Sequence, residues 1–150
     1  DNVSYTITID PSSSITSYNT MTSSTLTGYT IDNDTAAISV GAKSGNTSEF
    51  VTTATINVTL STIPTANVSI VVTDNDSSEV SVSPTTLTIT SSTWNTTNQV
   101  TLTGQDDNLS DGNITYRVSF ATATSTDTKY NGMASSPAYI DVVNVDDGND

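Results

Sequence analysis

Carboxylates are the side chains of this sequence best suited to chemistry. Sixteen acidic residues face three basic ones, which gives a formal net charge of −13 and an isoelectric point near 4.1. Clustered carboxylates are natural ligands for a hard cation, above all calcium. The same balance argues against a nucleic-acid partner, because phosphate binding needs patches of Lys and Arg. Many of the acids lie in short clusters beside turn-forming residues, at positions 32–34, 74–76, 106–111 and 146–147.

Other reactive side chains are scarce. The sequence has no Cys and no His, so disulfides, zinc-finger sites, thiol nucleophiles and Ser-His-Asp arrangements are excluded. Asp106 and Asp111 would be a candidate glycosidase pair, but loop aspartates in an acidic protein are weak support for one. We therefore expect no enzymatic activity. No apolar stretch approaches the length of a membrane-spanning helix and no signal peptide is recognisable, so we interpret the chain as a mature or excised segment.

Strict alternation of apolar and polar residues dominates the sequence and indicates β-strands rather than helices. Most of the intervening positions carry Thr, Ser or Asn, as expected for strands with one packed and one wet face. Short strands separated by turn-forming residues predict an all-β, antiparallel sandwich. The alternating apolar positions are Tyr5-Ile7-Ile9, Ala54-Ile56-Val58-Leu60, Val68-Ile70-Val72, Val80-Val82, Leu87-Ile89, Val100-Leu102, Ile114-Tyr116-Val118-Phe120 and Ile140-Val142.

The sequence also repeats itself with a period of about 112 residues. The segment Asn2-Val-Ser-Tyr-Thr-Ile-Thr-Ile9 matches Asn113-Ile-Thr-Tyr-Arg-Val-Ser-Phe120, and Tyr18-Asn-Thr-Met21 matches Tyr130-Asn-Gly-Met133. Both copies continue through an aromatic segment into an acidic tail. We therefore interpret residues 1–34 as the closing strands of one module with an acidic linker, residues 35–147 as a complete module, and residues 148–150 as a further acidic linker.

Residues 1–34 are too short to bury an apolar face alone, and three arrangements would solve that problem. They could complete a preceding module of a longer array. They could donate strands to a neighbouring chain by β-augmentation. They could also pack as extra strands on the module that follows them. The first two arrangements make the segment an assembly element.

Several motifs of residues 35–147 occur in a characteristic order. Glu49 precedes a strand that ends in Leu60-Ser-Thr-Ile-Pro64, and Ser83-Pro84 precedes Leu87-Thr-Ile89. Trp94-Asn95, Asp106-Asp107, Asp111-Gly112 and Val145-Asp146-Asp147 follow. In this order the segment resembles the Calx-β-like repeats of large bacterial extracellular proteins. The resemblance implies a seven-stranded immunoglobulin-like sandwich, in tandem, with calcium bound where the acidic linker meets the loops.

The resemblance also implies a ligand set for calcium. Local turn chemistry, in which a side chain bonds its own backbone, is the competing interpretation of the acidic clusters and is favoured for Asp32, Asp34 and Asp74. Extracellular modules bind calcium with dissociation constants of about 10⁻⁴–10⁻³ M. The candidate ligands implied by the resemblance are Glu49, Asp76, Asp106, Asp107, Asp111, Asp146 and Asp147.

Asn-x-Ser/Thr triplets are frequent and suggest attached glycans. The Ser/Thr-rich stretches at residues 12–14 and 22–25 are candidates for O-linked sugars instead. A Thr-rich alternating strand also generates such triplets without any glycosylation. The candidate asparagines are Asn2, Asn33, Asn46, Asn57, Asn67, Asn75, Asn95, Asn108 and Asn113.

Two functions remain open from the sequence. The first is a structural repeat unit of an extracellular surface fibre or bacterial adhesin, joined head to tail to copies of itself or to adjacent modules. The second is a carbohydrate-binding module of a secreted protein, which would need Trp94 and two tyrosines exposed in a line. We expect Trp94 to be part of the core instead. Neither function involves nucleic acid or insertion into a membrane.

Overall fold

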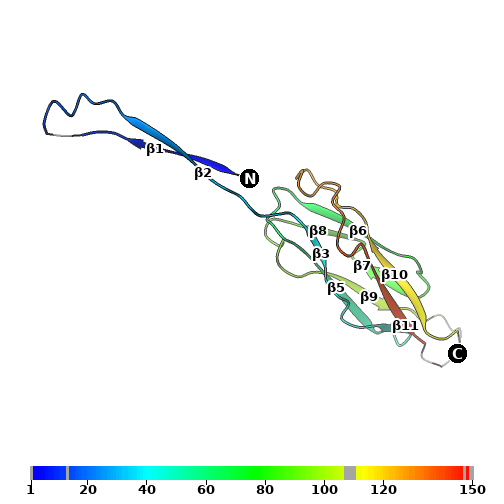
Figure 1. Cartoon of the computed structure of the whole chain (residues 1–150). Helices are drawn as coiled ribbons and strands as arrows, with labels where there is room; N and C mark the ends of the chain where they lie inside the picture. The colour runs from blue at the N-terminus through cyan, green and yellow to red at the C-terminus, as the bar shows by residue number, and fades with distance from the viewer. Residues whose placement is uncertain (1, 13, 107–110, 147, 149–150) are drawn as a thin grey trace. The chain divides into compact units, whose positions relative to one another are not determined.

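The computed structural model describes residues 2–12, 14–106, 111–146 and 148. Its described residues form strands, turns and loops, without a helix, which confirms the all-β prediction. Accordingly, they offer no helix long and apolar enough to cross a membrane. The chain divides into two compact units, Asp1–Asp34 and Thr35–Asp150 (Figure 1). The division falls at the boundary expected from the repeat.

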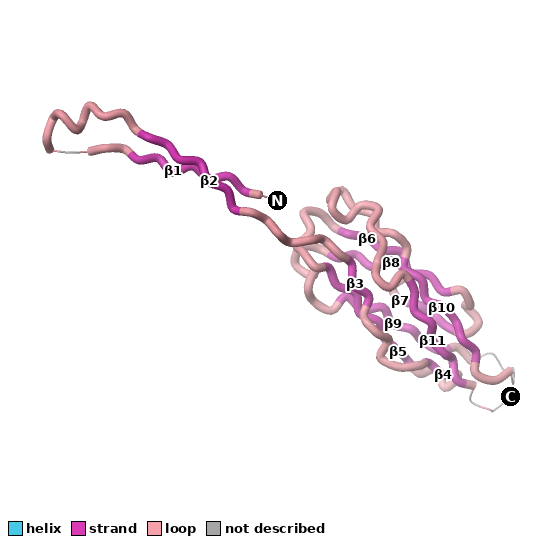
Figure 2. Tube along the Cα trace, viewed as in Figure 1, coloured by secondary structure: helices cyan, strands magenta, loops and turns pink. Residues whose placement is uncertain are grey.

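The first unit is a β-hairpin. Strands β1 (Val3–Ile9) and β2 (Ser24–Thr30) pair antiparallel (Figure 2). In this register Tyr5 lies opposite Gly28. Directly opposed residues lie on the same face, so the register places Tyr5, Ile7 and Leu26 on one face and threonines mainly on the other. A Cβ added at Gly28 would lie 2.5 Å from the Tyr5 ring, so this ring covers the position where β2 lacks a side chain.

The second unit is a β-sandwich. One sheet has the strand order β4-β11-β10-β6-β8 and the other has the order β3-β5-β9-β7. Neighbouring strands are antiparallel except for β4, which pairs parallel with β11. The strands are β3 (Ile38–Val40), β4 (Thr47–Ser48), β5 (Thr53–Leu60), β6 (Val68–Asp74), β7 (Val80–Ser83), β8 (Thr86–Ile89), β9 (Asn98–Gly104), β10 (Ile114–Phe120) and β11 (Tyr139–Val145).

Two segments of the sandwich change sheet along their length. The chain leaves β7, which pairs with β9, and enters β8, which pairs with β6, at Pro84. Proline has no N–H to donate, so it ends one hydrogen-bond ladder before the next begins. The segment from β3 to β4 also crosses between the sheets, because β3 pairs with β5 in one sheet and β4 pairs with β11 in the other. In the described part of the chain the sandwich therefore has nine strands, two more than the seven implied by the family resemblance.

The core lies between the two sheets and is formed by the alternating apolar positions. Tyr116, Val118 and Phe120 point inward, as the alternation predicts, and Trp94 packs partly buried against the core. Burying a side chain of this size stabilises a fold by about 1.5–3 kcal/mol. The other buried apolar residues are Ile38, Val40, Ala54, Ile56, Val58, Leu60, Val68, Ile70, Val72, Val80, Val82, Leu87, Ile89, Val100, Leu102, Ala123, Tyr130 and Val142.

Candidate functional site

Two buried carboxylates lie at the end of the sandwich where β4 and β11 stop. Glu49 follows β4, and its backbone N–H donates to the carbonyl of Val145 at 3.1 Å. Glu79 precedes β7, and its carbonyl accepts a hydrogen bond from the Gln105 N–H at 3.0 Å. Burial of carboxylates is costly without compensating partners. This end of the sandwich therefore concentrates two buried carboxyl groups.

Asn144 connects the Glu79 carboxylate to the backbone just after β9 of the opposite sheet. Its Nδ2 donates to Glu79 Oε2 at 3.1 Å and to the Gln105 carbonyl at 3.0 Å. Its Oδ1 is buried and has no hydrogen-bond partner. A Cβ on Gly104 would collide with the Ser48 carbonyl oxygen and lie 2.6 Å from Asn144 Oδ1, so glycine at residue 104 leaves room for both groups. Asn144 is thus a buried polar residue in an inward strand position.

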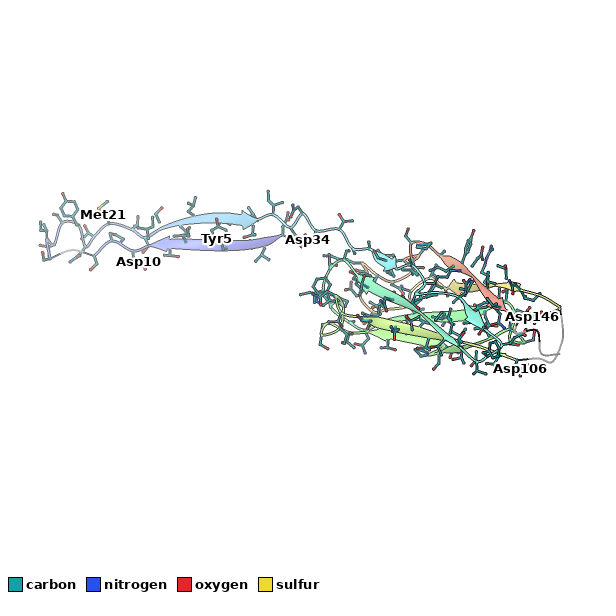
Figure 3. All side chains as sticks on the ribbon, turned by 90° about the horizontal axis from the view of Figure 1, so that it is seen from below. Tyr5, Asp10, Met21, Asp34, Asp106 and Asp146 are labelled. Carbon is teal, nitrogen blue, oxygen red and sulfur yellow. The ribbon has the colours of Figure 1, made fainter. Side chains whose placement is uncertain are left out.

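Asp146 organises the loop where β11 ends. One carboxylate oxygen accepts from the Gly112 N–H at 2.9 Å and the other from the Gly148 N–H at 2.7 Å. Its own N–H donates to Asn113 Oδ1 at 3.1 Å. Gly112 and Gly148 have φ angles of 79° and 69°, a conformation that glycine adopts without strain. Asp106 and Asp146 lie at the same end of the sandwich in Figure 3.

The predicted calcium ligands are only partly assembled by the described residues. Glu49, Asp106, Asp111 and Asp146 lie near one end of the sandwich. The Asp76 carboxylate accepts hydrogen bonds from the N–H and hydroxyl of Ser78, the local turn chemistry that competes with metal binding. Asp107 and Asp147 lie outside the described residues.

The oxygen atoms at this end are nevertheless of the types that calcium prefers. Calcium prefers carboxylate, amide and carbonyl oxygens, and the end provides all three, including the unpartnered Asn144 Oδ1. Within the described ranges, no three acidic side chains come close enough together to hold a metal ion. The described acidic residues at this end are Glu49, Glu79, Asp106 and Asp146, and no three of them form a ligand cluster. An ion bound here would therefore need amide and carbonyl oxygens to complete its ligands.

Sequence reasoning missed Glu79 and Asn144. Glu79 directly precedes the alternating pair Val80 and Val82, and it lies outside the acidic turn clusters from which ligands were expected. Asn144 continues the alternation of Ile140 and Val142, so a polar residue at an inward strand position was the available signal.

Every described candidate for N-glycosylation has an exposed side chain. Several of them use Oδ1 as a hydrogen-bond acceptor, and a sugar would be attached at the other end of the amide, Nδ2. Asn57 accepts from Gln99, Asn75 accepts from the Arg117 N–H, and Asn46 accepts from Lys43. Asn108 lies outside the described residues. The exposure of these asparagines is compatible with modification.

The aromatic residues of the sandwich do not form an exposed line. Tyr116 and Tyr130 are buried, and Trp94 packs against the core. Burial raises the pKa of the Tyr116 hydroxyl, which hydrogen-bonds with Thr47 Oγ1 at 3.1 Å. Tyr139 is exposed, with the Arg117 guanidinium 3.8 Å from its ring centroid. The arrangement required by the carbohydrate-binding alternative is therefore missing from the described sandwich.

Arg117 and Asp141 are the two charged residues that line a shallow polar hollow. The hollow is lined by Asn75, Thr115, Tyr116, Arg117 and Asp141. Arg117 Nε donates to Asp141 at 2.7 Å. This hydrogen bond holds the pKa of the Asp141 carboxyl below its usual range and raises the pKa of Arg117. Because both side chains are exposed, the pair contributes little to stability.

The hairpin of the first unit repeats the geometry of β10 and β11. Asn2 Oδ1 accepts from the Asp32 N–H at 2.8 Å, and Asp32 Oδ1 accepts from the Asp34 N–H at 3.1 Å. Asn113 and Asp146 make the same two contacts in the sandwich. The strand registers also agree, because Tyr5 pairs with Gly28 as Tyr116 pairs with Val142. The Asp32 carboxylate therefore accepts a hydrogen bond from the backbone two residues further on, as the Asp146 carboxylate does.

The comparisons with known proteins leave the resemblance to Calx-β-like repeats untested. The chain matches no model of a known protein family, and no curated protein matches it significantly.

Proposed function

We propose that this chain is a structural repeat unit of an extracellular surface fibre or adhesin. Its units join head to tail through shared β-strands and through acidic ends that bind calcium. The observation that carries the proposal is the first unit: it has the register and end contacts of β10 and β11, while its apolar face is exposed. An isolated two-stranded hairpin is marginally stable in water at best. A strand pair with an exposed apolar face gains stability when other strands cover that face, as they would in an assembly.

Calcium would have a mechanical role in such an assembly. The buried carboxylates of Glu49 and Glu79 and the loop carboxylate of Asp146 lie around the point where the chain leaves β11. Without a cation, neighbouring carboxylates repel one another and favour open loop conformations. A bound ion would remove that repulsion and stiffen the exit of the chain from the module. We assign the same role to the Calx-β-like pattern of acidic residues.

The composition of the surface supports the proposal that the protein is located outside the cell. Thr and Ser occupy most of the outward strand positions, and the exposed sequons offer sites for glycans. Glycans on strand faces would hinder edge-to-edge aggregation of a protein built from sheets. We therefore propose a glycosylated fibre that is bacterial and located at the cell surface.

Immunogold electron microscopy of cells that make the protein tests this function. Antibodies raised against residues 35–150 should label surface filaments or other surface structures on intact cells. Cells that lack the gene provide the control for specificity. Gold particles confined to the cytoplasm of sectioned cells, with none on the surface, would overturn the proposal.

A further inference from the structure

The loop that joins β1 to β2 repeats a turn of the sandwich. The Tyr18 N–H donates to the Ile15 carbonyl at 3.0 Å, and the Met21 N–H donates to the Tyr18 carbonyl at 3.2 Å. In the sandwich the Tyr130 N–H donates to the Asp127 carbonyl at 3.1 Å, and the Met133 N–H donates to the Tyr130 carbonyl at 3.1 Å. The repeat thus includes the turn as well as both strands and their end contacts.

The sandwich shows what surrounds such a hairpin when it is in place. Strand β10 pairs with β6, and β11 pairs with β4, so the hairpin lies between two other strands of its sheet. Tyr116 hydrogen-bonds with Thr47. Tyr130 Oη donates to the Thr62 carbonyl at 2.8 Å and accepts from the Thr62 N–H at 3.1 Å. Tyr116 therefore attaches the hairpin to β4, and Tyr130 attaches the hairpin's loop to the segment that follows β5.

The equivalent side chains of the first unit are exposed. Tyr5 is 50% exposed and Ile7 49%, against 1% for Tyr116 and 0% for Val118. Tyr18 is 55% exposed, whereas Tyr130 is completely buried. An apolar face of this kind is unusual on a protein surface and indicates a missing cover.

We propose that β1 and β2 occupy the position of β10 and β11 in a second β-sandwich of the same kind. They insert between its equivalents of β6 and β4, with Tyr5 against the equivalent of Thr47 and Tyr18 against the equivalent of Thr62. The proposal rests on the fibre function above and specifies the joint between units. The sandwich of residues 35–150 is not the acceptor, because its own β10 and β11 fill that position.

Insertion into a sheet explains the apolar face better than addition to a sheet edge. Edge addition satisfies backbone hydrogen bonds and leaves the faces of the added strands to find their own cover. Insertion places one face against the opposite sheet, as it does for Val118 and Val142 here. The face formed by Tyr5, Ile7 and Leu26 therefore needs an opposite sheet to cover it.

The proposal can be tested by adding a second acceptor, built from the protein's own strands, to the chain. Residue 112 is the counterpart of residue 1, because Asn113 is the counterpart of Asn2. Residues 35–111 are therefore fused directly before residue 1 of the full chain. Trp94→Phe in the original sandwich leaves Trp94 of the added strands as the only tryptophan. We expect a cooperative urea transition of its fluorescence, and amide exchange of Tyr5 and Ile7 at least about tenfold slower than in the unfused chain.

Paired variants separate docking from general folding. Tyr5→Ser with Ile7→Thr in the fusion should abolish the fluorescence transition of the added strands. Thr6→Ser with Thr8→Ser, on the opposite face, should preserve it. No transition with the intact hairpin, or the same transition with Tyr5→Ser and Ile7→Thr, would overturn the proposal. Surface filaments labelled by immunogold would in that case still support the fibre function, so the two failures are distinguishable.

Discussion

Strands β1 and β2 pair in the same register as β10 and β11 and end in the same asparagine–aspartate contact, yet their environments are opposite. Ile9 is 63% exposed and its counterpart Phe120 is 4% exposed. The comparison separates two kinds of information in one repeated sequence. Register, turns and end contacts are specified locally and form in both copies. Burial is supplied by other strands and is present in only one.

Local contacts and burial contribute unequally to the free energy of folding. A local turn or end contact contributes about 0.5–1.5 kcal/mol, whereas complete burial of one large apolar side chain contributes about 1.5–3 kcal/mol. The sandwich has both contributions, so its β10 and β11 are fixed. The hairpin has only the first, and its strands gain stability when a cover is supplied. Substitutions at equivalent positions should therefore have effects that differ between the copies.

The largest difference is expected for Tyr116→Ala compared with Tyr5→Ala. Removing a large buried aromatic side chain costs about 3–5 kcal/mol, and Tyr116 also bonds with Thr47. The same substitution at the exposed Tyr5 should change the stability of the sandwich by less than about 0.5 kcal/mol. Urea unfolding followed by Trp94 fluorescence measures both. A comparable loss in Tyr5→Ala would mean that the hairpin packs on the sandwich of its own chain.

Asp127 gives a second, pH-dependent difference, since its counterpart in the hairpin is Ile15. Its carboxylate accepts from the backbone N–H groups of Thr65 at 2.8 Å and Lys129 at 2.9 Å. The Thr65 hydrogen bond is the main cause of the lowered pKa of Asp127. Asp127→Ala should cost about 1–3 kcal/mol, because it leaves part-buried donors unsatisfied.

The sign of the pH dependence follows from that lowered pKa. The stabilisation is complete above the ordinary Asp pKa of about 3.9 and is lost as the pH falls through the lower pKa of the folded state. Asp127→Asn keeps one acceptor oxygen and cannot titrate, so it should unfold with a smaller dependence on pH below about 4. Thermal unfolding between pH 2 and 7 measures this. An unchanged acid profile in Asp127→Asn would contradict the role assigned to this carboxylate.

The sequence predicts most of the strands because each has enough alternating residues to define a period. Residues 54–60 and 114–120 are clear cases, and their inward positions are buried in the structure. Strands β3 and β4 have three and two residues, too few for any periodicity. The change of sheet at Pro84 depends on which strands lie alongside, and that information is nonlocal.

The candidate site was predictable to the extent that its residues lie in turns. Asp106 and Asp146 belong to acidic turn clusters, and Glu49 was expected only from the resemblance to Calx-β-like repeats. Glu79 and Asn144 are buried by contacts between segments far apart in the sequence, so no local pattern identifies their role. Their pairing follows from the register of β11 and the position of β7 in the opposite sheet, which only the assembled sheets define.

Calcium is expected to stabilise the sandwich and not the hairpin, because the buried acids Glu49 and Glu79 occur only in the sandwich. At a free calcium concentration ten times the dissociation constant, the folded sandwich should gain about 1.4 kcal/mol. Glu79→Gln should reduce that gain, and Asp34→Asn in the hairpin should leave it unchanged. Thermal unfolding with calcium and with a chelator measures the difference. Equal melting temperatures of the unmodified protein in both conditions would exclude a calcium site that contributes to stability.

The smallest effect is expected where the copies are most alike. Asn2→Ala and Asn113→Ala each remove the acceptor for the N–H of the aspartate that follows the second strand. Both asparagines are exposed, so each loss should cost about 0.5–1 kcal/mol. Amide exchange measured by NMR should accelerate at Asp32 in the first variant and at Asp146 in the second, by similar factors. A much larger acceleration at Asp146 would show that this contact depends on the surrounding sandwich rather than on local sequence.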